Sequence, residues 1–243
     1  MRIRAVIAYD GTDYHGFQRQ SPDREPSIQG MLEGALGKIG QPGGVLGAGR
    51  TDAGVHASGQ VVAFNVDWRH SLNDLQRALN ATLPEDIAVL ELEQTADTFH
   101  PRYDAVSRAY RYRISNTRVR DPLTMRYALH VPQELNIDAM RQAVAHTIGT
   151  HDFAAFGQPT VGESTIRSLY RAEVVATGPS IAIELQANGF LYRMVRRIVG
   201  TLIVIGRGEQ TPQDFNDILE SADPNCAGPA VAPSGLCLIA VNY

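Results

Sequence analysis

The segment RTDAG, residues 50–54, places one carboxylate between an arginine and two small residues. If the segment is extended, Arg50 and Asp52 point to the same face, where the guanidinium would orient the carboxylate and favour its charged form. Ala53 and Gly54 leave room for a bulky substrate to reach the carboxylate oxygens. Asp52 is therefore a candidate nucleophile or base, and the alternative interpretation is an ordinary polar residue of a turn.

Two other segments carry groups that could assist such a carboxylate. Tyr110 stands among arginines on an expected strand, where its ring could stack on an unpaired base or simply join the core. Arg196 and Arg197 interrupt an apolar helix, so at least one of them is expected to turn inward. A buried arginine needs an anionic partner, and Asp52 is a candidate for that partner.

Several other chemistries lack support in the sequence. There is no phosphate-binding loop or dinucleotide glycine fingerprint, and no second carboxylate stands in a setting that suits a two-carboxylate glycosidase. The seven histidines are not paired at metal-ligand spacing, so a zinc site is not expected. His56 lies near Asp52 and is expected to form hydrogen bonds within its loop. Cys226 and Cys237 form no disulfide framework, which is typical of a reduced, cytoplasmic setting.

Charge is unevenly distributed along the 243 residues. The formal net charge is −4, yet residues 101–120 hold six arginines against one acid, and residues 193–207 hold four arginines and no acid. An arginine-favouring codon usage explains the choice of arginine over lysine but not the clustering. The two clusters indicate a local anionic partner such as RNA.

The elements that must position these groups follow from periodicity. Strands are expected over residues 2–9, 58–66, 87–94, 107–115, 168–177, 180–187 and 236–243, and helices after Ser27, Ser71, Asn136 and Thr211 and over 190–206. Each half reads roughly as strand, helix, strand, helix, strand. This order predicts an α+β fold, a mainly antiparallel sheet flanked by helices, with halves at residues 1–105 and 106–243 forming one continuous catalytic unit.

The ordered motifs together resemble one family. GRTDAGVHASGQVVAF is similar to the signature of the tRNA pseudouridine synthases that modify the anticodon stem-loop. The resemblance continues through YDGTDYHGFQRQ at 9–20, FHPRYDAVSRAYRYRI at 99–114, NGFLYRMVRRIVGTL at 188–202 and PSGLCLIAV at 233–241. Phe17 stands where a tryptophan is more usual in the family.

The resemblance implies a set of roles and a substrate. Asp52 would be the catalytic aspartate, Tyr110 would stack on the target uracil, and Arg196 would pair with Asp52. Arg50 and Thr51 would shape the same site, and Leu236 would form an apolar wall. The implied fold is the pseudouridine synthase fold with two ferredoxin-like halves. The implied reaction isomerises uridine at positions 38, 39 and 40 of tRNA, without a cofactor or metal, by a homodimer.

Two other functions are consistent with the same residues. An RNA-binding module would use the arginines and Tyr110 without chemistry, and a nucleoside hydrolase would use Asp52 as its nucleophile and release free base. No apolar run approaches the roughly 20 residues of a membrane span. The opening residues, MRIRAVIAYD, lack the apolar core of a secretory signal, so a cytoplasmic protein with no membrane partner is expected.

Overall fold

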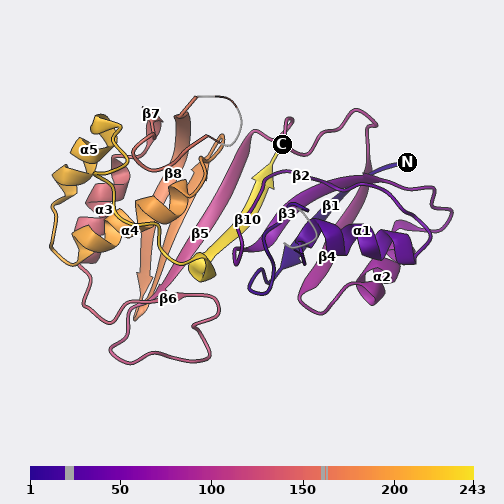
Figure 1. Ribbon diagram of the computed structural model, residues 1–243, viewed down its shortest axis with the longest axis horizontal. Helices are drawn as coiled ribbons and strands as arrows, with labels where there is room; N and C mark the ends of the chain where they lie inside the picture. Colours follow the sequence, from indigo (N-terminus) through magenta and orange to yellow (C-terminus); the bar gives the residue numbers. More distant parts are fainter. Residues whose placement is uncertain (20–24, 160–161, 163) are drawn as a thin grey trace. The chain divides into compact units, whose positions relative to one another are not determined.

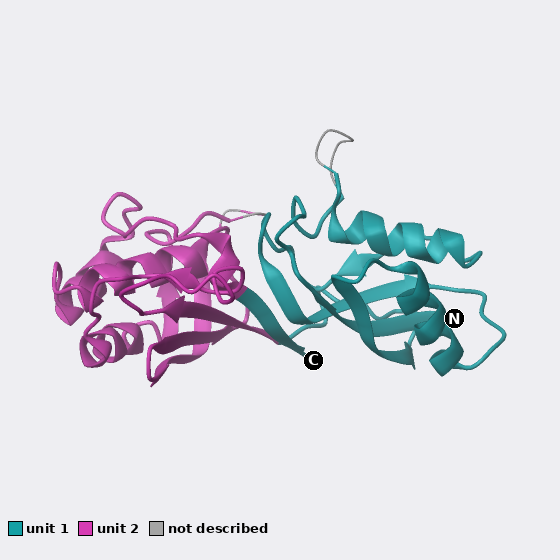
Figure 2. Cartoon of the chain, turned by 90° about the horizontal axis from the view of Figure 1, so that it is seen from below, with its two compact units in different colours: residues 1–106, 237–243 teal, residues 107–236 magenta. Residues whose placement is uncertain are grey.

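The computed structural model describes residues 1–19, 25–159, 162 and 164–243 (Figure 1). The chain divides into two compact units, which Figure 2 colours separately: unit 1 comprises residues 1–106 and 237–243, and unit 2 comprises residues 107–236. The sequence places residues 237–243 with the second half, whereas the structure places them in unit 1. The physical reason is strand pairing, because Cys237 and Leu238 align in parallel with the start of strand β3 (His56–Asn65).

Unit 1 has the βαββαβ order of a ferredoxin-like half. Its elements are β1 (Arg2–Tyr9), α1 (Ile28–Lys38), β2 (Leu46–Gly47), β3 (His56–Asn65), α2 (Leu72–Thr82), β4 (Ile87–Thr95) and, from the end of the chain, all of β10 (Leu236–Asn242) except its first residue. The strand order is β4-β1-β3, and these neighbours are antiparallel; β2 also pairs with β3 in antiparallel orientation. The α+β class predicted from the sequence is confirmed.

The core of unit 1 follows the predicted periodicities. Alternate residues of β1 are buried, and α1 buries a stripe at helical spacing. These buried residues are Ile3, Ala5, Ile7 and Tyr9 in β1 and Ile28, Leu32, Ala35 and Leu36 in α1. Burial of each large aliphatic side chain stabilises the unit by about 1.5–3 kcal/mol, so this core is what holds β1 and its following loop in place.

Unit 2 has strands and helices of its own in the part of the chain that the structure describes. Its elements are β5 (Ser107–Ser115), β6 (Leu129–His130), α3 (Ile137–Ala145), β7 (Gly149–Asp152), β8 (Ile166–Thr177), β9 (Ser180–Ala187), α4 (Met194–Gly206), α5 (Pro212–Ser221) and the 3₁₀ turn η2 (Pro233–Gly235). The strand order is β5-β9-β8-β7, with antiparallel neighbours. Helix α3 packs against β8, α4 and α5, and Figure 1 shows these elements together.

The predicted helix starts are confirmed at all four capped positions. The side chains of Ser27, Ser71, Asn136 and Thr211 each accept a hydrogen bond from a backbone N–H in the first turn. At Ser71 and Thr211 an aspartate at the third helical position completes a capping box. Such a cap typically stabilises a helix by about 1 kcal/mol, and it depends only on neighbouring residues.

The predicted start of one helix and the predicted end of another are wrong. Helix α4 begins at Met194 rather than Phe190, because Tyr192 forms a bridge with Gln158 and holds the preceding residues extended. Arg193 then takes a left-handed conformation, with φ 62°, at the helix N-cap. Helix α3 ends at Ala145 rather than continuing to Ile148, which is exposed. In the described part of the chain, no helix is long and apolar enough to span a bilayer.

Candidate active site

Asp52 lies in a turn between β2 and β3. The sequence allowed an extended segment with Arg50 and Asp52 on one face, but residues 48–55 contain no strand. The carbonyl of Asp52 accepts a hydrogen bond from the N–H of Val55 at 3.1 Å, and Gly54 takes φ 76° inside the turn. Glycine is the residue that adopts this conformation most readily. The side chain of Asp52 is half-buried, and Arg50 is exposed.

The turn is anchored on both sides of Asp52. Before it, Thr51 is buried, its hydroxyl lies 2.8 Å from the hydroxyl of Tyr9, and its carbonyl accepts a hydrogen bond from Phe17 N–H at 3.1 Å. After it, the N–H of Gly54 donates to the carbonyl of Tyr14 at 3.3 Å. These bonds connect the turn to β1 and to the loop that follows β1, so the carboxylate stands on a fixed backbone.

The loop after β1 packs against the turn so closely that two of its residues must be glycine. A Cβ on Gly11 would lie 2.0 Å from the carbonyl oxygen of Val55. A Cβ on Gly16 would lie 2.7 Å from the carbonyl oxygen of Thr51, and Gly16 also has φ 97°. Both distances are far shorter than van der Waals contact. The sequence showed these glycines in the family-like segment at 9–20, but their spacing alone did not reveal what they contact.

Two tyrosines of this region stay protonated. Burial raises the pKa of Tyr9 well above its ordinary value, an effect that its hydrogen bond to Thr51 opposes. Burial, followed by the neighbouring carboxylate of Asp86, raises the pKa of Tyr14, whose hydroxyl donates to Asp86 Oδ1 at 2.7 Å. Neutral hydroxyls can donate or accept hydrogen bonds without placing a second negative charge near Asp52.

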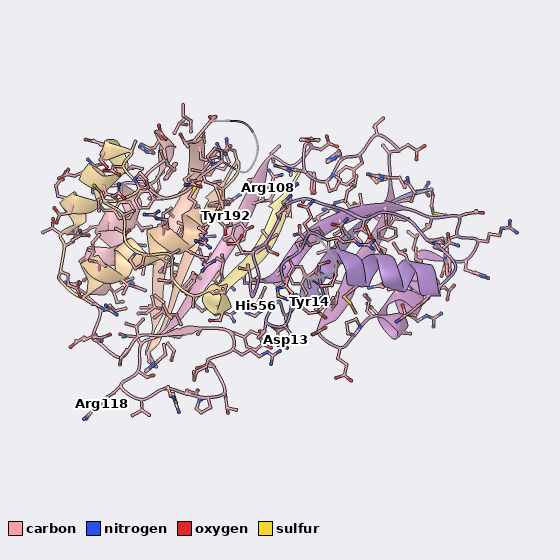
Figure 3. The ribbon with its side chains drawn as sticks, in the orientation of Figure 1. Asp13, Tyr14, His56, Arg108, Arg118 and Tyr192 are labelled. Carbon is pink, nitrogen blue, oxygen red and sulfur yellow. The ribbon has the colours of Figure 1, made fainter. Side chains whose placement is uncertain are left out.

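His56, the first residue of β3, also supports this loop. Its ring is buried, and Nδ1 lies 3.1 Å from the N–H of Gly11 and 3.1 Å from Asp10 Oδ1. Figure 3 shows Asp13, Tyr14 and His56 in the same region of unit 1. His56 forms a hydrogen bond, as expected, but its partner lies in the loop after β1 rather than in its own loop. Across the described residues, no three His, Cys, Asp or Glu side chains gather as a metal site would require.

In unit 2, Tyr110 and Tyr112 occupy the same face of β5 but different surroundings. Tyr112 is fully buried, and its hydroxyl donates to the carbonyl of Ala232 at 2.7 Å, so it is the core aromatic of this strand. Tyr110 is half-buried, and its ring forms a T-shaped pair with the ring of Phe190, with centroids 5.1 Å apart. This contact restricts the orientation of the Tyr110 ring. Phe190 lies in the family-like segment at 188–202, but its spacing alone did not show that it contacts Tyr110.

The two arginines of α4 bind the chain segment that leads to β10. Arg196 is half-buried, and its Nε donates to the carbonyl of Val231 at 2.7 Å. Arg197 donates to the carbonyls of Pro224 and Ala227. The prediction that at least one of them turns inward is confirmed. A guanidinium carries five N–H donors, so a bond through Nε fixes its orientation and leaves capacity for an anion.

The predicted site residues are divided between the units. Arg50, Thr51 and Asp52 belong to unit 1, where the structure brings them together in one turn. Tyr110, Arg196 and Leu236 belong to unit 2, and the side chain of Leu236 is buried. The pairing of Arg196 with Asp52 stays a prediction.

Comparison with known proteins gives these residues a context. A family model described as tRNA pseudouridine synthase matches residues 5–104 and 143–243. The tRNA pseudouridine synthase A of Exiguobacterium sp. is 42% identical over 244 residues, which cover 100% of this chain and 98% of the relative. The protein of that name from Roseiflexus castenholzii is 44% identical over 247 residues, covering 99% of this chain and 90% of the relative. The similarity therefore extends over both units.

Proposed function

This chain belongs to the tRNA pseudouridine synthase family, and we propose that it isomerises uridine to pseudouridine at positions 38, 39 and 40 of the tRNA anticodon stem-loop, with Asp52 as the catalytic carboxylate. The observation that carries the assignment of Asp52 is its anchored turn. Thr51 and Gly54, on either side of it, are hydrogen-bonded to residues of β1 and its loop. A carboxylate on a fixed backbone is preorganised for attack.

The reaction needs one carboxylate and rearranges bonds within a single nucleoside. The glycosidic bond between N1 and C1′ breaks, the uracil turns, and C5 forms a new bond to C1′. The hydrogen on C5 leaves as a proton, and N1 gains one, so no oxidant or reductant is required. Asp52 either attacks C1′ to form a covalent adduct or removes a sugar proton to give a glycal intermediate; both routes use the same ionised side chain.

The other predicted residues have distinct roles in this reaction. Tyr110 stacks on the target uracil and holds it while the base is detached, because diffusion of the base would leave an abasic site. Arg196 pairs with Asp52 and orients it, and its own orientation is fixed by the carbonyl of Val231. Leu236 forms an apolar wall, and Arg50 and Thr51, which stand next to Asp52 in the turn, shape the same site.

Recognition of the substrate rests on arginine. Contacts to phosphate position an RNA and carry little sequence information, which suits an enzyme that modifies several neighbouring positions. The target uridine must leave its stack, at a cost of a few kcal/mol, and positions in a loop or at a stem end lower that cost. We propose that the enzyme acts as a homodimer in the cytoplasm, where its tRNA substrate is found.

The decisive experiment is tritium release from C5-labelled uridine in transcribed tRNA. We expect release by the wild type and none by Asp52→Asn, which keeps the shape of the side chain but removes its charge. Asp97→Asn is the matched control, because Asp97 is an exposed acid of the same unit, and it should release tritium at the wild-type rate.

The products distinguish the remaining functions. Transcripts that keep a single uridine at position 38, 39 or 40 show which positions are modified. Free uracil with an abasic tRNA would identify a nucleoside hydrolase instead. Binding without either product, on tRNAs that carry uridines in the anticodon arm, would identify an RNA-binding module.

A further inference from the structure

The connection between β5 and β6 is a long basic loop, residues 116–128, which we call the β5–β6 loop. Figure 1 shows it extending away from the sheet of unit 2. Its apolar side chains are unusually exposed, since Leu123 is 89% exposed and Val119 is 75% exposed. Exposed apolar side chains grouped in one loop are a common feature of binding surfaces.

The loop has a defined shape. The side-chain amide of Asn116 donates to the carbonyls of Val131 and Gln133, which fixes its first residue. The carbonyl of Asp121 accepts hydrogen bonds from the N–H groups of Thr124 and Met125, forming a turn at the tip. A loop held in this way presents its side chains in a fixed arrangement, so a partner loses less entropy on binding to it.

The charges of the loop are mainly positive. Arg118 and Arg120 are exposed and form neither a hydrogen bond nor an ion pair in the part of the chain that the structure describes. Figure 3 shows Arg118 pointing away from unit 2. Asp121, the single acid among residues 116–128, accepts the N–H of Leu123 with one carboxylate oxygen.

Two exposed arginines on helices show the alternative, in which the guanidinium is already paired. Arg77 on α2 forms an ion pair with Asp74, and Arg141 on α3 forms one with Asp138. Among the described residues, the β5–β6 loop instead keeps two unpaired guanidinium groups within five residues of an exposed leucine. Guanidinium groups bind phosphate through charge-assisted hydrogen bonds, and an apolar side chain packs on ribose or base surfaces. This combination fits RNA better than an acidic peptide, which offers no large apolar faces.

We propose that the β5–β6 loop is a second tRNA-binding element, in which Arg118 and Arg120 bind phosphates and Leu123 packs on a neighbouring sugar or base; this inference rests on the proposed function. The site of contact is separate from the target uridine. Tyr110 and Ser115 are five residues apart on β5, which corresponds to about 17 Å, and the loop begins beyond Ser115. The element therefore contributes to affinity for the tRNA and not to the chemical step.

The test compares tRNA affinity with the saturated isomerisation rate for the full chain. We expect Arg118→Ala with Arg120→Ala to weaken binding of an unmodified tRNA transcript by about tenfold or more at physiological salt. The slope of log affinity against log salt should fall in magnitude by about 1.5–2, because two phosphate contacts are lost. Leu123→Ser should weaken binding with the slope unchanged, since it removes no charge. The saturated single-turnover rate should equal that of the wild type in both variants.

The matched control removes two other exposed positive charges. Lys38 and Arg69, both in unit 1, are exposed and without an ion pair among the described residues, so Lys38→Ala with Arg69→Ala changes the net charge equally. If the control weakens binding as much as the loop variant, the effect is one of total charge and the proposal is overturned. A wild-type affinity in the loop variant overturns it as well.

A further measurement separates RNA from another copy of this chain as the partner. Sedimentation of the loop variants should show the same oligomeric state as the wild type, as the proposal requires. A shift to a smaller species would show that the loop joins copies of the chain and would overturn the assignment to RNA. Absence of isomerisation by the wild type, with loop-dependent binding intact, would contradict the proposed function alone.

Discussion

The buried hydroxyl pair of Tyr9 and Thr51 should be strongly coupled in stability. The two oxygens lie 2.8 Å apart, and the two side chains are only 4% and 6% exposed. Because water has little access, removal of one hydroxyl leaves the other without its partner in a buried place. The double-mutant cycle of Tyr9→Phe and Thr51→Val tests whether this pair anchors the turn that carries Asp52.

The magnitude follows from two contributions. A hydrogen bond within a protein stabilises it by about 1 kcal/mol net, and a buried polar group left without a partner costs about 1–3 kcal/mol. Each single substitution should therefore lower the free energy of unfolding by about 2 kcal/mol. Replacing both partners by apolar groups of similar shape is nearly neutral, so the double substitution should cost about 1 kcal/mol. The expected coupling is then about 3 kcal/mol.

Urea denaturation of the four proteins measures these values, and tritium release measures turnover in parallel. Turnover should fall in Tyr9→Phe, since the turn loses an anchor although no reacting group is changed. Tyr112→Phe combined with Thr51→Val is the control, because Tyr112 donates to Ala232 and lies in unit 2. That control pair should be additive within about 0.5 kcal/mol. If the effects of Tyr9→Phe and Thr51→Val on the free energy of unfolding also added within about 0.5 kcal/mol, the idea that the two hydroxyls depend on each other would be refuted.

Three other substitutions have expected outcomes. Ala222→Gly should raise the free energy of unfolding by about 1 kcal/mol, because Ala222 follows α5 with φ 52°, a conformation that glycine adopts more readily. A lower free energy of unfolding in urea denaturation would contradict this. Gly16→Ala should cost about 2 kcal/mol or more and lower turnover, since its Cβ would meet the Thr51 carbonyl, and unchanged values would contradict this. Hydrogen bonds from Thr211 lower the pKa of the Asp214 carboxyl in the folded protein. The ionised carboxylate therefore contributes its full stabilisation above the unfolded-state pKa of about 3.9, and this stabilisation is lost as the pH falls through the lower, folded-state pKa. In Asp214→Asn, the free energy of unfolding should therefore fall less steeply with decreasing pH than in the wild type. The same dependence on pH in both proteins would contradict this role of Asp214.

Features that depend on neighbouring residues were predictable from the sequence. The four helix caps each need one polar side chain within three residues of the N–H that it accepts, and all four are present. The alternation in β1 likewise depends on which face of one strand is buried. Short strands such as β2, β6 and β7 have two to four residues, too few for any alternation to stand out.

Features that depend on distant residues were not predictable. The apolar run before Met194 continues a helical pattern, and only the bridge to Gln158 shows why the helix starts late. The contact of Tyr9 with Thr51 joins residues 42 positions apart, and the packing of Gly11 under Val55 joins residues 44 apart. The RTDAG pattern made Asp52 a candidate and the resemblance implied its catalytic role, which stays a prediction, whereas the groups that hold its turn could be found only from the fold.

The turn and the chemistry at Asp52 are two aspects of one arrangement. From the sequence RTDAG alone, a turn is an alternative to a catalytic role for Asp52, because a turn needs only a polar residue and a small one. A carboxylate inside β3 would lie within a largely buried strand, where a nucleotide has little access. A turn exposes the carboxylate but is usually mobile, and this one is fixed by bonds at Thr51 and Gly54. The residues that make the segment a turn are thus also those that make an accessible, oriented carboxylate possible, so evidence for the turn supports the catalytic assignment.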